Sequence, residues 1–324
     1  MAEGNEVRVD PKYTGVPKEI ALELQEYEVT YFREDKPIPF CGLLLYPATV
    51  RDYEAFTGSS SCLTLNKNTT LDGLRMSNLD FLASKMVGKS NEASLMSYQV
   101  QRLAEIVFHI KNGIKCKHCG RVMPYDGPEF REYAANVRSC VENGKAPPPP
   151  KCSECGNEEF IEEIKLVKPE GEKNHSLLVD GHAISSSDFD RLRQIILFQN
   201  YFDYRDDSWV DPALKADYEA RLELERKTND AHATIEQKVC GLSLVSNYKI
   251  DEIYDLTIRH FTMLITMAED LINYKILKTA TMSGFVSLPK GQKIEHWMYK
   301  PDRDMYGDAY KSLDSIKAAA GARN

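Results

Sequence analysis

Two short loops with the same Cys-x-x-Cys-Gly motif constrain the fold of this 324-residue chain more than any other feature. The two pairs of cysteines are separated by 32 residues. Four thiolates supplied by two tight loops are the usual ligand set of a tetrahedral structural Zn2+ site. The glycine after each pair accepts the positive φ that such a turn tends to require. We therefore predict one structural Zn2+ per chain, held by Cys116, Cys119, Cys152 and Cys155.

The same cysteines could in principle serve redox or catalytic chemistry, and the pattern argues against both. A thioredoxin-like Cys-x-x-Cys stands alone at the end of a strand, whereas this chain has two matched pairs. Four thiolates also close the coordination shell, so no position is left for water or substrate. A rubredoxin-type iron would use the same four thiolates, so the sequence leaves the metal open. Cys140 and His118 are the alternative ligands in this segment.

Composition narrows the class of protein and its partners. An apolar share of 42% is ample for conventional cores, while the formal charge of -8 disfavours nucleic acid or an anionic membrane as a general partner. The chain starts without a basic segment followed by an apolar run, and it contains no eighteen consecutive apolar residues. We expect no secretion signal, no membrane span and a reducing compartment.

The N-terminal part, residues 1–113, is expected to be a small β-rich head with helices. "LQEYEVTYFREDKPIPFCGLLLYPATV" predicts two strands joined by a Glu-Asp-Lys-Pro turn. A helix is expected after Thr49 as N-cap. Apolar residues at helical spacing predict further helix between residues 76 and 112, with a helix start at Asn91 or Ser94 and an end at Asn112-Gly113.

The remaining chain divides into four expected parts. Residues 114–165 form a zinc-ribbon module with a short inserted helix and a run of four prolines. Residues 166–187 form an irregular link with one short strand at "SLLVDG", ending at Asp188 as a helix N-cap. Residues 188–299 form a mainly α-helical domain in which "IDEIYDLTIRHFTMLITMAEDLINYKILKTA" is one long helix, and residues 300–324 form a flexible or docking tail. The fold class is α+β.

In the same domain, "VDPALKADYEARLELERKTNDAHATIEQKV" predicts a helix with Asp211 as its N-cap.

The other candidate functional sites in the sequence have simple structural explanations. The acidic stretch "FDYRDDSWVDP" lacks the glycine and terminal glutamate of a calcium loop, so we interpret it as a solvated turn between helices. His175 and His182 flank Asp180, but no nucleophile accompanies them, and we expect a polar loop. No P-loop, GxGxxG, GxSxG or HExxH occurs, so we expect that the protein is not an enzyme.

The order of parts resembles bacteriophage tail and baseplate proteins involved in baseplate hub or tail assembly. The resemblance rests on "KPIPFCGLLLYPATVRDYEAF", "MSNLDFLASKM", the zinc insertion, "FDRLRQIILFQNYFDYRDDSWVDPALKADYEARLELE" and the ending "SGFVSL" to "KIEHWMY". It implies a non-enzymatic virion component or assembly protein that binds other tail or baseplate proteins or further copies of itself. It also implies a place in the virion, or in the host cytoplasm during assembly.

The alternative function is a zinc-ribbon nucleic-acid-binding or transcription-related factor. The zinc module would then contact DNA or RNA through a local basic surface despite the acidic chain. That surface would consist of Lys115, Lys117, Arg121, Arg131, Arg138, Lys145 and Lys151. A metalloenzyme is a third possibility, which would need an open metal position.

Overall fold

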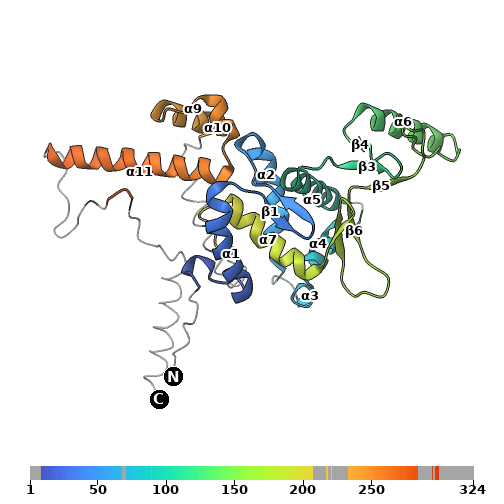
Figure 1. The fold of residues 1–324 in the computed structure, drawn as a ribbon, viewed down its shortest axis with the longest axis horizontal. Coiled ribbons are helices and arrows are strands. Elements are labelled where there is room, and N and C mark those ends of the chain that lie inside the picture. The colour runs from blue at the N-terminus through green and yellow to red at the C-terminus, as the bar shows by residue number, and fades with distance from the viewer. Residues whose placement is uncertain are drawn as a thin grey trace, which may run out of the picture. The chain divides into compact units, whose positions relative to one another are not determined.

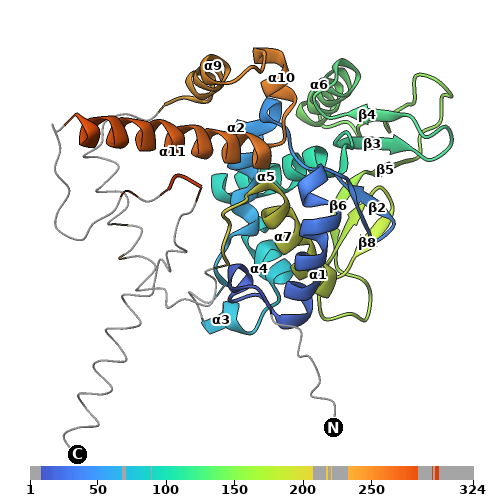
Figure 2. The same cartoon turned by 60° about the vertical axis from the view of Figure 1, so that its left-hand side comes forward.

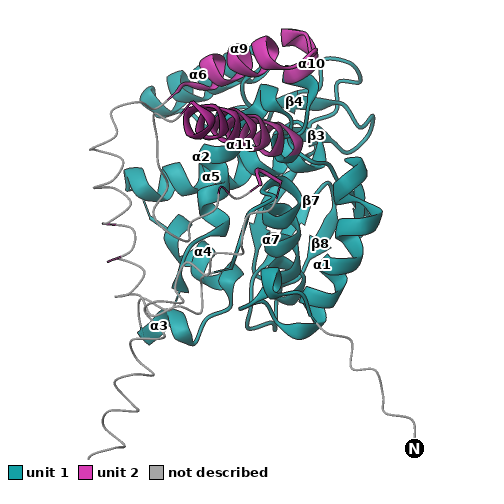
Figure 3. Ribbon diagram, turned by 90° about the vertical axis from the view of Figure 1, so that its left-hand side faces the viewer, with its two compact units in different colours: residues 1–209, 254–259 teal, residues 210–253, 260–324 magenta. Residues whose placement is uncertain are grey.

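The structure is a computed structural model that describes residues 9–67, 71–88, 90–206, 217, 220, 233–283, 294 and 296–298. The fold is α+β, with small antiparallel sheets in the N-terminal half and helices toward the C-terminus (Figure 1). The chain divides into two compact units (Figure 3). Unit 1 comprises Met1–Trp209 and Tyr254–Arg259, and unit 2 comprises Val210–Ile253 and His260–Asn324.

Unit 1 contains helices and three small sheets. Its helices are η1 (Pro11–Tyr13), α1 (Lys18–Thr30), η2 (Phe32–Glu34), η3 (Val50–Asp52), α2 (Tyr53–Ser60), η4 (Ser61–Leu63), α3 (Leu71–Leu74), α4 (Asn78–Met86), α5 (Asn91–Phe108), α6 (Pro128–Glu142) and α7 (Ser186–Asn200). Its strands are β1 (Ile38–Phe40), β2 (Leu43–Leu45), β3 (Gly113–Cys116), β4 (Val122–Pro124), β5 (Phe160–Glu162), β6 (Ile164–Val167), β7 (Ser176–Val179) and β8 (His182–Ile184). The sheet orders are β1-β2, β4-β3-β5 and β6-β7-β8.

Helix α7 lies at the centre of the main core of unit 1 (Figure 2). It packs against α1 and α4, while α5 packs against α2 and α4. Ile195 and Phe198 of α7 are fully buried, as are Leu24 of α1 and Leu79 of α4. Burying α7 on several faces explains why its residues 195–198, "IILF", are apolar at four consecutive positions rather than on one stripe.

The predicted N-terminal hairpin exists, but its limits differ from the prediction. The segment "LQEYEVT" is the second half of α1 and not a strand, because Ala21 and Leu24 recur at helical spacing and are both buried in the core. The Glu-Asp-Lys-Pro sequence precedes the first strand. The turn between β1 and β2 is instead Cys41-Gly42, where both residues have positive φ, as a tight two-residue hairpin turn requires.

Helices α4 and α5 confirm the helical prediction for residues 76–112. Helix α5 begins at Asn91, one of the two predicted starts, and Ser90 accepts a hydrogen bond from the backbone N–H of Ala93. The helix ends at Phe108, earlier than predicted, because His109 adopts a left-handed conformation with φ of 53°. Gly113, predicted to end the helix, is instead the first residue of β3.

Residues 166–187 were expected to be an irregular link with one short strand at "SLLVDG". That strand is confirmed as β7, but the rest of the expectation is wrong, because the segment also contains β8 and the end of β6. Residues 166–187 contain most of the three-stranded sheet β6-β7-β8, in which Ile164 pairs with Val179 and Leu177 pairs with Ile184. Those four side chains are buried in the main core. The N-cap of α7 is also Ser185 and not Asp188: Ser185 Oγ accepts from the Asp188 backbone N–H at 3.1 Å.

Helices α9 (Ile235–Val245), α10 (Ile250–Asp255) and α11 (Ile258–Met282) follow. The stretch predicted as one helix from residue 250 is therefore two helices. The break occurs because the backbone pairs with unit 1 residues: Val50 N–H donates to Leu256 O and Ile258 N–H donates to Ala48 O, each at 2.9 Å. The end of α11 at Met282 agrees with the prediction. The predicted cap Asp211 and the predicted tail, residues 300–324, lie outside the described residues.

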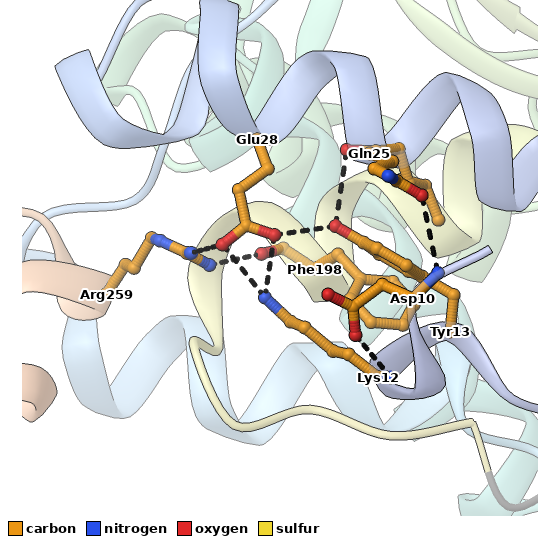
Figure 4. A network of polar contacts seen from close by, with 8 residues as sticks. Asp10, Lys12, Tyr13, Gln25, Glu28, Phe198 and Arg259 are labelled. Atoms are coloured by element: carbon orange, nitrogen blue, oxygen red, sulfur yellow. Dashed lines mark hydrogen bonds and ion pairs between the residues drawn. The ribbon is translucent and has the colours of Figure 1, made fainter. Parts of the chain in front are cut away.

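Within unit 1, a polar network connects Arg259 to the N-terminal part of the chain (Figure 4). Arg259 is 3% exposed and donates to Glu28 Oε1 at 2.9 Å and to Phe198 O at 2.8 Å. Glu28 also accepts from the Tyr13 hydroxyl at 2.7 Å and from Lys12 Nζ at 3.1 Å. Three segments thus meet at the Glu28 carboxylate, and Arg259 adds a contact to a fourth at Phe198. Among the described residues, no helix is both long enough and apolar enough to cross a membrane.

Candidate metal centre

The four predicted cysteines lie together at one end of the sheet β4-β3-β5 (strands in Figure 1). Cys116 is the last residue of β3 and pairs with Phe160 of β5. The four Sγ atoms all lie within 4.8 Å of one another, and Cys116 Sγ lies 3.5 Å from Cys155 Sγ. Cys119 Sγ and Cys152 Sγ are also 3.5 Å apart. The spacing in the sequence therefore predicted a real cluster.

The two loops have the same backbone hydrogen bonds, which explains why they share the Cys-x-x-Cys-Gly motif. In the first loop, the Gly120 N–H donates to Cys116 O at 3.0 Å, and in the second the Gly156 N–H donates to Cys152 O at 2.8 Å. Both glycines have positive φ, 75° and 70°. A residue with a Cβ would be strained in this conformation. The glycines are thus required by the turn that brings two sulfurs of each loop to one point.

The backbone also polarises the sulfurs. Amide groups of Cys119 and His118 lower the pKa of Cys116, and those of Cys155 and Glu154 lower the pKa of Cys152 to about 7. The Arg121 amide acts in the same direction on Cys119, but burial and the neighbouring thiols outweigh it and raise the pKa of Cys119 to about 12. Four thiolates at this spacing repel one another, so a divalent cation is needed for all four to ionise together.

This donor set fits Zn2+. Four thiolate sulfurs give a closed tetrahedral shell of soft ligands, which suits a structural zinc or a rubredoxin-type iron. Neither His118 nor Cys140 belongs to the cluster, which consists of the four cysteines first predicted. Within the described parts of the chain, no other group of three or more His, Cys, Asp or Glu side chains is placed to hold an ion.

Arg121 connects the two loops to α6. The inserted helix was predicted from the sequence, but this connection was not. Its guanidinium donates to Glu154 Oε1 at 2.9 Å, between the cysteines of the second loop, and to Glu129 Oε1 at 2.6 Å. Ser153 Oγ also donates to Glu129 at 3.2 Å. The sequence signal for this connection was the pair of opposite charges: Arg121 directly follows the first Cys-x-x-Cys-Gly loop, and Glu154 lies within the second. We interpret Arg121 as a brace that holds the two halves of the site in register.

The proposed basic surface of the module is largely neutralised. Lys115 pairs with Asp180 at 2.5 Å, and Arg121 pairs with two glutamates as described above. Lys117 pairs with Glu159, and Lys151 lies 3.8 Å from Glu158. Residues 114–165 carry eight lysines and arginines against nine aspartates and glutamates. The module thus lacks the positive field that phosphate backbones require.

The acidic stretch "FDYRDDSWVDP" is partly buried in the structure. Asp206 was expected in a solvated turn, but it is 4% exposed and accepts from Gln194 Nε2 at 2.5 Å, so that expectation is wrong for this residue. Asp203 is exposed, while Asp207 and Asp211 lie outside the described residues.

The residues of "HSLLVDGH" are engaged separately. His175 Nδ1 lies 2.7 Å from Asp80 Oδ1 at the start of α4, whereas Asp180 in the β7–β8 turn pairs with Lys115. His182 lies in β8. The structure therefore does not bring the two histidines and Asp180 together as one acid–base group.

Comparison with known proteins gives one match. A family model described as "YomV second domain" matches residues 226–302, about a quarter of the chain. YomV is a phage-associated family, so the match points toward a phage protein. The matched segment contains α9, α10 and α11. No curated protein and no solved structure matches this chain.

Proposed function

We propose that this protein is a non-enzymatic structural or assembly component of a bacteriophage tail or baseplate, which acts through protein–protein contacts. The phage-associated match over residues 226–302 supports the phage context. The four-cysteine cluster supports a structural site with one Zn2+ per chain. The partners in this proposal are other tail or baseplate proteins, or further copies of this chain.

The observation that carries the proposal is the exposure of apolar side chains within the matched segment. Leu244 at the end of α9 is 87% exposed, and Met282 at the end of α11 is 86% exposed. Along α11, Ile272 and Ile276 are four residues apart on one helix face, and Ile276 is 60% exposed. Exposed apolar residues grouped on helices are typical of surfaces that bind another protein.

The test uses substitution of that surface in the phage that encodes the protein. We expect Ile276→Lys combined with Met282→Lys to reduce incorporation into tail particles at least about tenfold, since a buried charge in the interface is costly. Leu71→Lys is the matched control, because Leu71 on α3 is equally apolar and exposed but lies in unit 1. Incorporation is measured by quantitative mass spectrometry of particles separated on a density gradient.

Normal incorporation of the double variant, or an equal loss for the Leu71→Lys control, would contradict the proposal. The far-ultraviolet circular dichroism of each purified variant shows whether its helices persist. A variant that keeps its helices and its metal yet fails to enter particles has lost an interface and not its fold.

A further inference from the structure

The run Pro147–Pro150 has no role in the metal centre described above. It lies in the segment 145–151, "KAPPPPK", which joins the end of α6 to the second cysteine loop. This segment forms neither helix nor strand, and all its residues are exposed except Pro150, which is half-buried. Four consecutive prolines on the surface need an explanation because a connection of this length could be made from ordinary polar residues.

Steric restriction determines the conformation of this run. The proline ring fixes φ near -65°, and each residue that precedes a proline is kept out of the α region. Ala146, Pro147, Pro148 and Pro149 all precede a proline. The run is therefore restricted to an extended, polyproline II-like helix with three residues per turn. Pro147 and Pro150 lie one turn apart and so project on the same side.

Both ends of the segment are held by ordered structure. At its start, the Lys145 N–H donates to Cys140 O at 2.8 Å, where α6 closes with Gly144 at a φ of 64°. At its end, the Cys152 N–H donates to Asn157 O at 2.9 Å, and the Cys152 sulfur belongs to the metal cluster. With both ends held and each proline ring restricting the backbone, the run has little conformational freedom to lose, which reduces the entropic cost of binding a partner.

We infer that Pro147–Pro150 is a recognition element for a partner protein with a groove lined by aromatic side chains. Proline rings spaced by one turn of a polyproline II helix fill such grooves, and the helix is already formed. Lys145 and Lys151 stand at the two ends of the run and are exposed. Lys151 lies 3.8 Å from Glu158, so the charge of Lys145 is the one that fits a groove with an acidic residue at its rim. The metal centre acts here as an anchor that presents the run, independently of the phage assignment.

The test measures binding to a defined probe. The probe is a purified SH3-type domain with a tryptophan-lined groove, and its negative control is the same domain with that tryptophan replaced by lysine. Isothermal titration calorimetry compares the intact zinc-loaded protein with a free "KAPPPPK" peptide. We expect the intact protein to bind the probe about tenfold more tightly than the peptide, because its run is preordered. The lysine-substituted probe should bind neither.

Matched variants distinguish recognition from a simple spacer. Pro147→Ala combined with Pro150→Ala removes the pair of prolines one turn apart and should weaken binding at least about tenfold. Pro148→Ala combined with Pro149→Ala keeps that pair and should change binding by less than about threefold. Both variants should retain one Zn2+, which confirms that the module is intact. Absence of binding by the intact protein, or equal behaviour of the two variants, would overturn the inference.

Discussion

The cysteines of this chain differ in what surrounds each sulfur. Cys62 is buried in the main core of unit 1, and burial raises the pKa of its thiol to about 12, so it behaves as a small apolar side chain. Cys116 and Cys152 instead receive backbone amides that favour the thiolate. Cys140 lies half-buried on α6, outside the cluster. These environments distinguish the clustered cysteines from the others.

We expect Cys116→Ser to abolish stoichiometric zinc binding. Serine is a hard and poorly ionised ligand, and even the loss of an outer-shell partner weakens metal affinity about 10- to 100-fold. Losing one of the four sulfur ligands should weaken zinc affinity by more than that range. Elemental analysis by mass spectrometry of the purified protein gives the zinc content per chain. The control Cys140→Ser should keep one zinc, and a Cys116→Ser protein that also keeps one would show that the cluster is not the site.

Glu28 is the residue on which the polar network of Figure 4 depends. We expect Glu28→Gln to lower the free energy of unfolding of unit 1 by about 3 kcal/mol, because it leaves Arg259 buried without its counter-charge. Urea unfolding followed by fluorescence measures this change. Glu34→Gln is the control: the Glu34–Lys36 pair is more than half exposed, and its loss should cost under about 1 kcal/mol. Equal effects would contradict the role given to burial.

The same carboxylate predicts a pH dependence. Burial alone would raise the pKa of Glu28, but the Tyr13 hydroxyl, Lys12 and Arg259 outweigh it and hold the pKa below its ordinary value of 4.5. A carboxyl with a lowered pKa stabilises the folded state fully above its unfolded pKa, and this contribution is lost as pH falls through the folded pKa. The stability difference between wild type and Glu28→Gln should therefore be constant from pH 7 to about 5.5 and shrink below about pH 4.5. A difference that persisted unchanged at pH 3 would exclude this linkage.

Among the elements, α7 is the most buried helix, and its stability depends in part on the hydrogen bonds that cap its first turn. Ser185 Oγ accepts from the Asp188 N–H and lies 2.6 Å from Asp188 Oδ2, so cap and first turn support each other. We expect Ser185→Ala to destabilise unit 1 by about 1 kcal/mol and Ser185→Thr by clearly less, since threonine keeps the hydroxyl. Thermal unfolding followed by circular dichroism compares the two. Equal losses would mean that the cap is not responsible.

Local patterns predicted some elements well. Helix α5 was predictable because its apolar positions repeat over eighteen residues and agree with its N-cap. The cysteine cluster was predictable because each loop builds its geometry from its own backbone, without help from the rest of the fold.

Elements that depend on distant partners were not predictable in the same way. Of strands β6, β7 and β8, only β7 was predicted, because each has only three or four residues, too few to show alternation, and the three exist because they cover the main core together. The second half of α1 contains Tyr27, Val29 and Thr30, which favour strands, but packing of Ala21 and Leu24 outweighs that preference. The brace from Arg121 to Glu154 joins residues 33 positions apart.

At the scale of the whole molecule, the main core of unit 1 and the metal module have separate sources of stability. The described members of the main apolar core come from residues before 111 and after 163. Ile164, near the end of the predicted module 114–165, belongs to this main core, so the module ends at residue 163 in the structure. Within residues 114–163, α6 has no buried residue, and the buried apolar side chains are Met123 with the sulfurs of Cys116 and Cys152. A module with so small a core would depend on the proposed metal, whose binding is worth on the order of 10 kcal/mol at such sites.

Removing the metal should therefore unfold the module and leave the main core intact. We expect a strong zinc chelator to make residues 114–163 sensitive to limited proteolysis, while the segments 9–108 and 164–206 stay protected, because their apolar core contains no module residue. Mass spectrometry of the fragments locates the cuts. The Cys116→Ser protein should show the same cuts without chelator, which ties the effect to the cluster. Cleavage throughout unit 1 on chelation would instead mean that the metal holds the main core as well, through the junction in which Lys115 pairs with Asp180 and Glu163.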